Sequence, residues 1–215
     1  MQSEQRRASC VFVVDDEEDV RDAIALLVKS HDLETRTFPS VDFFLAQFDP
    51  EQPGCLVLDV RMPGRSGLEL QEWLARHAIP LPIIFVSGHG DIPMAVRAVH
   101  RGAVDFLQKP FSDGQLLERI DTALELDARR REEAAVTADV RRRLDALTPR
   151  EREVLTLLMD GKPNKLIARA LDVSPRTVEI HRARVLQKMG MDNASQLVRV
   201  MLEAGLEVDL REHRQ

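Results

Sequence analysis

Charged residues end several short apolar segments of this 215-residue chain, and this pattern constrains the fold more than any other feature. Asp15 and Asp16 follow the apolar run 10–14. Asp59 ends the run 55–58, and Lys109 comes just after Phe106 and Leu107. Short apolar segments that alternate with helical patterns predict a parallel α/β sheet. Because ligands of such sheets bind beyond the carboxyl ends of the strands, these side chains are expected to meet in one crevice.

The expected crevice holds three carboxylates and one lysine, which restricts its chemistry. Carboxylates repel one another when they are close, so the site calls for a divalent cation. Mg²⁺ suits it, because this ion is held by a few carboxylates together with water and phosphate oxygens. The residues therefore favour phosphoryl transfer onto a carboxylate.

Five strands with intervening helices are expected over the first 124 residues. The strands are expected at 10–14, 34–38, 55–59, 83–87 and 104–108. The helices are expected at 17–30, 40–48 and 67–77, after an N-cap at Asp91, and after a capping box at Ser112. Several of the strands are almost wholly apolar, as strands covered on both faces must be. The prediction is a flavodoxin-like (βα)5 domain at 8–124, so the chain as a whole is α/β plus all-α.

The remainder of the chain predicts helices only. Residues 125–143 are rich in charge and lack Gly and Pro, which indicates a solvated helical linker. Residues 144–208 predict a four-helix domain with helices at 149–159, 164–171, 174–189 and 193–204. Two short helices joined by a tight turn, the second of them basic, are typical of a helix-turn-helix.

Charge is distributed unevenly, although the whole chain carries a net charge of −6. Residues 1–123 have a net charge of −8, whereas 162–188 contain seven basic and two acidic residues. This basic stripe, 162–188, is either a footprint for nucleic-acid phosphates or a solvated helix face. No segment is apolar over the length of a membrane span, so a cytoplasmic protein without a membrane partner is expected. Cys10 and Cys55 are expected to be buried and unpaired.

The first half of the chain resembles the receiver domain of two-component response regulators. The motifs are Val14-Asp15-Asp16, the segment Leu58 to Gly64, Ser87-Gly88 and Lys109-Pro110-Phe111. The second half resembles the LuxR-type helix-turn-helix through segments 147–151, 164–168 and 174–181. Together they resemble the NarL/FixJ family, and segment 87–96 points to its FixJ branch.

The resemblance implies a role for each residue of the crevice. Asp59 is expected to accept a phosphoryl group from a sensor histidine kinase, with Lys109 and Ser87 contacting that group. Asp15, Asp16, Asp59 and the backbone carbonyl of Arg61 are expected to hold Mg²⁺. Ser87 and Phe106 form the expected switch. The family usually has Thr at the Ser87 position and often has Tyr at the Phe106 position.

The predicted helix 174–189 is the second helix of the helix-turn-helix, which is called the recognition helix. Its residues Val178, Val185 and Met189 are expected to face inward and Gln187 outward. Glu179, Ile180 and Ala183 suit base edges, whereas Lys165, Arg184 and Lys188 suit phosphates. The full set of expected DNA-binding residues is Lys165, Arg176, Thr177, Glu179, Ile180, His181, Ala183, Arg184 and Lys188.

Two other functional classes remain open on the sequence. A phosphohydrolase would need a second acid or base near the nucleophile, and the position two residues on is Arg61. A degenerate receiver that serves only for protein binding would be expected to have lost part of the pocket.

The favoured hypothesis is a regulator that is not an enzyme toward other substrates. Phosphorylation is expected to produce a homodimer through the fourth helix, fifth strand and fifth helix. The dimer is expected to bind promoter DNA and, with RNA polymerase, to activate transcription. Slow autodephosphorylation is expected from the bulk of Arg61 and His89. In the resting state, the acidic receiver is expected to cover the basic stripe.

Overall fold

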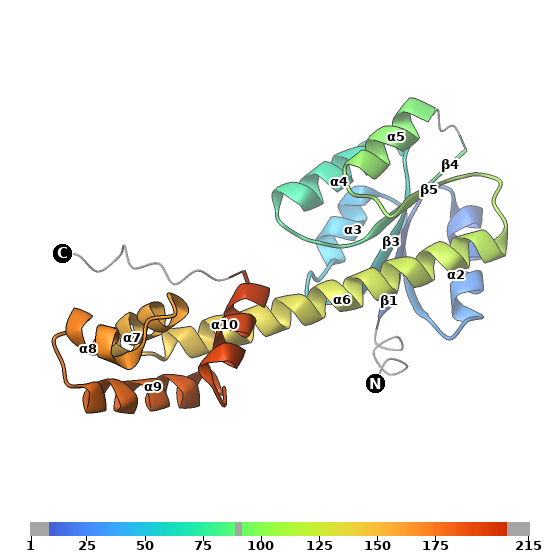
Figure 1. Cartoon of the computed structure of the whole chain (residues 1–215). Helices are drawn as coiled ribbons and strands as arrows, with labels where there is room; N and C mark the ends of the chain where they lie inside the picture. Colours follow the sequence, from blue (N-terminus) through green and yellow to red (C-terminus); the bar gives the residue numbers. More distant parts are fainter. Residues whose placement is uncertain (1–8, 89–91, 206–215) are drawn as a thin grey trace. The chain divides into compact units, whose positions relative to one another are not determined.

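The computed structural model describes residues 9–88 and 92–205 (Figure 1). The chain divides into two compact units, the first ending at Arg131 and the second beginning at Glu132. In the described residues, no helix is both long and apolar enough to cross a bilayer.

The first unit contains the predicted five-stranded parallel sheet. Its strands are β1 (Cys10–Val14), β2 (Glu34–Phe38), β3 (Gly54–Asp59), β4 (Ile83–Ser87) and β5 (Asp105–Gln108). Their order is β2-β1-β3-β4-β5, and every neighbouring pair is parallel. Every residue of β1, β3 and β4 is buried, because helices cover both faces of the sheet. The flavodoxin-like prediction is confirmed.

Helices cover both faces of the sheet (Figure 1). One face packs against α2 (Glu18–Lys29) and the first turns of α6 (Asp113–Asp145). The other face packs against α3 (Val41–Gln47), α4 (Gly67–Arg76) and α5 (Ile92–His100). The predicted box at the start of α6 is present, since Ser112 N donates to Gln115 Oε1 at 2.9 Å. The predicted cap Asp91 lies outside the described residues.

The helix α6 runs for 33 residues, through the whole segment predicted as a linker. That segment is helical, as expected, but two of its residues are buried. Asp127 is 2% exposed, and its carboxylate accepts a hydrogen bond from Gly54 N in the first unit. Val140 is 3% exposed, because it packs in the core of the second unit. Both ends of the predicted linker therefore belong to folded units.

The second unit contains the four predicted helices, α7 (Pro149–Met159), α8 (Asn164–Ala170), α9 (Pro175–Met189) and α10 (Ala194–Glu203). Thr148 and Glu151 form a reciprocal capping box at the start of α7. Gly190 ends α9 at φ +68°, a left-handed conformation that glycine adopts without strain. Two apolar clusters hold the unit together, one centred on Val185 and Leu155 and the other on Val178 and Ile167.

Candidate functional site

The topology brings the predicted pocket residues to one edge of the sheet. Asp15 follows β1, Asp59 ends β3, Ser87 ends β4 and Lys109 follows β5. The strand register places Val14 beside Leu58 and Asp59 beside Val86, so the strand ends lie level. Parallel strands direct their carboxyl ends to the same edge, which is why residues far apart in sequence meet here. We refer to Asp15, Asp59, Ser87 and Lys109 as the Asp59 pocket.

Lys109 bridges the two buried carboxylates of this pocket. Its Nζ lies 2.7 Å from Asp15 Oδ2 and 3.3 Å from Asp59 Oδ1. Asp15 is 0% exposed and Asp59 is 6% exposed. Two carboxylates this deeply buried require a nearby cation, because ionised groups are costly to remove from water without a partner.

The other carboxylate oxygens are held by the backbone. Asp59 Oδ2 accepts from Arg61 N at 2.6 Å, and Asp15 Oδ1 accepts from Glu17 N at 2.9 Å. These bonds fix the orientation of both carboxylates. With Oδ2 of Asp59 bound to the backbone, its Oδ1 faces Lys109.

The electrostatics of the pocket oppose the ionised form of Asp59. Burial raises the pKa of Asp59, and the hydrogen bond from Arg61 and the charge of Lys109 only partly offset this effect. For Lys109, burial lowers the pKa, but the hydrogen bonds and charges of Asp15 and Asp59 outweigh it and the net pKa is raised. The pocket is therefore short of positive charge, which favours binding of a further cation.

The donor set suits a hard cation but does not form a complete protein cage. Among residues 9–88 and 92–205, no three acidic, His or Cys side chains group together to hold a metal ion. Asp15 and Asp59 converge, whereas the Asp16 side chain is exposed. Mg²⁺ commonly takes only one or two carboxylates and completes its shell with water and phosphate oxygens, so these donors fit it.

The expected switch residues lie next to this pocket. Ser87 is 2% exposed, and its carbonyl oxygen accepts from Lys109 N at 2.9 Å. Phe106 is half-buried, with its ring 6.3 Å from that of Phe85. His89, expected to slow hydrolysis, lies outside the described residues, and the side chain of Arg61 is exposed.

Two residues near the pocket were missed from the sequence. Arg21 Nη1 donates to the carbonyl oxygen of Asp15 at 2.7 Å, and Glu17 Oε1 lies 3.5 Å from Lys109 Nζ. The helical pattern could have indicated Arg21, because it lies in the first turns of α2, directly beyond β1.

The second candidate site is the outer face of α9. Val178, Val185 and Met189 are fully buried, as predicted. The expected base-reading residues Glu179, Ile180 and Ala183 are exposed, as are Arg176, Arg184 and Gln187. Thr177 and His181 are half-buried, and Thr177 Oγ1 lies 2.8 Å from Ser174 Oγ at the cap of α9.

The basic stripe is less uniform than the sequence indicates. Arg182 bonds to Asn164 Oδ1, and Lys162 pairs with Asp160 at 3.1 Å. Lys188 Nζ donates to Glu151 Oε2 at 2.7 Å, so this expected phosphate contact already has an acidic partner within the unit. Within the basic stripe, the exposed basic residues for which the described structure contains no ion pair are Lys165, Arg169, Arg176 and Arg184.

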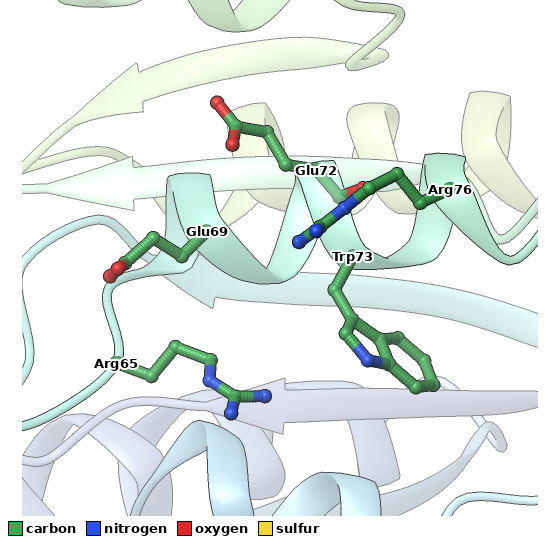
Figure 2. Close-up of a pocket in the computed structure, with 5 residues that line it drawn as sticks. All are labelled: Arg65, Glu69, Glu72, Trp73 and Arg76. Atoms are coloured by element: carbon green, nitrogen blue, oxygen red, sulfur yellow. The ribbon is translucent and has the colours of Figure 1, made fainter.

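A further concave surface runs along α4, and it shares no lining residue with the Asp59 pocket. Figure 2 shows its lining residues, which are Arg65, Glu69, Glu72, Trp73 and Arg76. Two arginines and two glutamates give it no net charge, so it favours neither an anionic nor a cationic ligand. Trp73 stacks on His77 with ring centroids 3.9 Å apart.

Comparison with known families matches each unit separately. Residues 11–121 match the response regulator receiver domain, and residues 145–201 match the luxR family of bacterial regulatory proteins.

Similar proteins match over most of the chain. The transcriptional regulatory protein FixJ of Rhizobium meliloti is 44% identical over 195 residues, which cover 91% of this chain and 96% of that protein. Nodulation protein W of Bradyrhizobium diazoefficiens is 41% identical over 213 residues, with 99% and 94% covered. The solved structure of the response regulator StyR is 42% identical with a TM-score of 0.84, covering 91% of this chain and 99% of that one. The chain therefore belongs to the two-component response regulators that combine a receiver domain with a LuxR-type helix-turn-helix DNA-binding domain.

Proposed function

We propose that Asp59 accepts a phosphoryl group from a sensor histidine kinase, and that this event controls promoter binding by α9. The observation that carries the proposal is the buried Asp59 carboxylate, with Lys109 Nζ 3.3 Å from its Oδ1. A carboxylate in this setting is a competent nucleophile toward phosphorus once the charge on the transferred group is neutralised.

In the proposed step, an Asp59 oxygen forms a bond to phosphorus while the bond from phosphorus to the histidine nitrogen of the kinase breaks. The imidazole leaves with the bonding electrons and takes up a proton. Lys109 pairs with the phosphoryl oxygens, and Ser87 donates its hydroxyl to one of them. Mg²⁺, held by Asp15, Asp16, Asp59 and the carbonyl of Arg61, would supply the remaining positive charge.

Phosphorylation is proposed to produce a homodimer, which binds promoter DNA in the cytoplasm and acts on RNA polymerase to activate transcription. Helix-turn-helix dimers read two half-sites, so dimerisation places two α9 helices for one operator. Support comes from α9, where Glu179, Ile180 and Ala183 are exposed. Glu179 suits cytosine N4, and the two apolar side chains suit a thymine methyl.

The experiment is phosphorylation of the full chain with acetyl phosphate and Mg²⁺, followed by phosphate-affinity electrophoresis and peptide mapping. One acid-labile phosphate is expected on Asp59 and none on Asp59→Asn. Asp42→Asn is the matched control, because Asp42 is an exposed carboxylate of the same unit and should leave labelling unchanged. Undiminished labelling of Asp59→Asn would contradict the proposal.

An enzyme of the phosphohydrolase class is the second candidate. Arg61 occupies the position two residues beyond Asp59, where such an enzyme would carry an acid or base, and its guanidinium cannot act as a base. Steady turnover of a small phosphomonoester, beyond one phosphate per chain, would favour that alternative.

A further inference from the structure

The C-terminal end of the recognition helix α9 is held by one ammonium group. Lys188 Nζ donates to Glu151 Oε2 at 2.7 Å and to the carbonyl oxygen of Ala146 at 3.1 Å. Glu151 lies in the first turn of α7, and Ala146 follows the last turn of α6. Lys188 therefore joins three segments of the second unit at one point.

Its main partner is a buried carboxylate. Glu151 is 3% exposed, and the Oε2 atom that binds Lys188 also accepts from Thr148 N at 2.9 Å. Burial raises the pKa of Glu151, but the hydrogen bonds from Lys188 and Thr148 outweigh this effect and the net pKa is lowered. If Lys188 turned toward a DNA phosphate, it would leave a charged carboxylate buried without its cation, which is strongly unfavourable.

A second contact holds the same end of α9. Arg143, in the last turns of α6, donates from Nη1 to the carbonyl oxygen of Met189 at 2.6 Å. Asp139 fixes this guanidinium through an ion pair of 2.7 Å. The guanidinium packs so closely on Gly190 that a Cβ there would lie 2.2 Å from Nη1. The end of α9 is thus fixed from two directions, while its exposed face remains available.

We propose that Lys188 is a positioning residue, which sets how α9 is presented to DNA through its bond to Glu151 and does not neutralise a phosphate. The inference deepens the proposed DNA recognition, and it depends on the helix-turn-helix domain but not on phosphorylation of Asp59. Arg184, one turn earlier on α9, is exposed and has no ion pair in the described residues, so it is the natural phosphate contact for comparison.

The two roles predict different salt dependences of DNA binding. The probes are a duplex that the wild-type full-length chain has selected from a random library, and a scrambled duplex of the same composition. A lysine on a phosphate contributes about 0.9 to the slope of log K against log salt, and losing it weakens both duplexes alike. A positioning lysine leaves the slope unchanged, and its loss weakens the selected duplex far more than the scrambled one.

Four variants of the full chain provide the test, measured at a temperature where circular dichroism shows each to be folded. Lys188→Met is expected to weaken the selected duplex about tenfold with an unchanged slope. Glu151→Gln is expected to weaken the selected duplex by a similar factor, also with an unchanged slope. This loss is expected although the substitution removes a negative charge and the side chain of Glu151 is buried. Combining the two should cost little more than either one. Arg184→Ala, the control, should lower the slope by about 0.9 and weaken both duplexes.

The opposite pattern would overturn the inference. A slope lowered by about 0.9 in Lys188→Met, with wild-type binding by Glu151→Gln, would make Lys188 a phosphate contact. If Lys188→Met does not fold, Glu151→Gln alone decides. If Lys188 contacts a phosphate, Glu151→Gln should bind the selected duplex at least as well as wild type. If Lys188 is a positioning residue, Glu151→Gln should bind the selected duplex clearly more weakly than wild type.

Discussion

The Asp127 carboxylate accepts a hydrogen bond from the backbone N–H of Gly54 at 2.9 Å, although 73 residues separate them. The same Oδ2 atom accepts from Arg131 Nε at 2.9 Å. Arg131 in turn donates to the carbonyl oxygens of Pro50, Glu51 and Gln52. One turn of α6 therefore satisfies the backbone groups that lead into β3.

Asp127→Ala should destabilise the first unit, because it leaves the Gly54 N–H without its acceptor and removes the carboxylate partner of the Arg131 guanidinium. The expected loss is about 2 kcal/mol, the typical cost of an unsatisfied buried donor. Chemical denaturation of the full chain measures it. Glu125→Ala is the control on the same helix, since Glu125 is exposed and should change stability by less than about 0.5 kcal/mol. A loss no larger than that of the control would show that the bond to Gly54 is dispensable.

Asp59→Asn should stabilise the first unit at neutral pH. Burial raises the pKa of Asp59, so the folded state binds the proton more tightly than the unfolded state. The ionised carboxylate therefore opposes folding above its raised pKa, and this penalty disappears as the pH falls toward about 4, the value in unfolded chains. The expected gain at pH 7 is about 1 kcal/mol, or roughly 3 to 5 °C in Tm.

Thermal unfolding of both proteins between pH 7 and pH 4 measures the difference. The Tm curves should approach each other as the pH falls, because the wild-type carboxyl then takes up a proton in the folded state. Asp42→Asn, at an exposed carboxylate, should run parallel to wild type. A Tm difference between Asp59→Asn and wild type that widens on acidification would contradict this prediction.

The sequence was sufficient for the sheet, since its apolar segments end where the structure ends the strands. It was also sufficient to place Asp59 and Lys109 together, because parallel strands bring their carboxyl ends to one edge. The contact of Asp127 with Gly54 was not predictable, because it depends on the length and direction of α6 and on no local pattern. A lone charged residue in a charged helix is most often solvated, and nothing in segment 125–143 distinguishes Asp127 from its neighbours.

On the outer face of α9, too, the sequence predicted burial but not a long-range contact. Helical periodicity placed Val178 and Val185 inside correctly, because burial follows directly from the apolar pattern. The bond between Lys188 and Glu151 was missed, since periodicity shows which way a residue faces but not which distant carboxylate lies there. The sequence signal was the capping-box Glu151, whose carboxylate needs a cation once α7 is packed.

Dimerisation on phosphorylation should depend on the outer face of α5. Val96 and Val99 are both 47% exposed there, an apolar pair on the side where the homodimer is expected. Val99→Asp should leave phosphorylation by acetyl phosphate intact but weaken self-association at least tenfold. Sedimentation velocity at micromolar protein measures the change in mass. Leu26→Asp, at an exposed apolar residue of α2, is the control and should dimerise normally. Normal dimers of phosphorylated Val99→Asp would exclude this face.

The phosphoryl group on Asp59 should be lost slowly, because Arg61, two residues beyond it and exposed, is expected to flank the approach of water and cannot activate it. Arg61→Asn replaces it with a short amide that can orient a water molecule. Hydrolysis should become faster by roughly threefold or more, about 0.7 kcal/mol in the barrier. The loss of phosphate from isolated phosphoprotein, followed over time by phosphate-affinity electrophoresis, gives the rate. Arg65→Asn is the exposed control outside the Asp59 pocket. Equal rates for Arg61→Asn and wild type would refute this steric argument.

A fragment that begins at Asp139 should bind DNA without phosphate, if the acidic receiver masks the basic stripe in the resting state. This start keeps Val140 in the core and Arg143 on Met189, contacts that a fragment starting at Thr148 would lose. We expect the Asp139 fragment to bind the selected duplex at least tenfold more tightly than the unphosphorylated full chain, with affinity that falls steeply with salt. The Thr148 fragment, the matched control, should have a lower Tm and weaker binding. Fluorescence anisotropy measures both affinities. Should the Asp139 fragment bind no better than the unphosphorylated full chain, masking is refuted, and dimerisation alone must account for the switch.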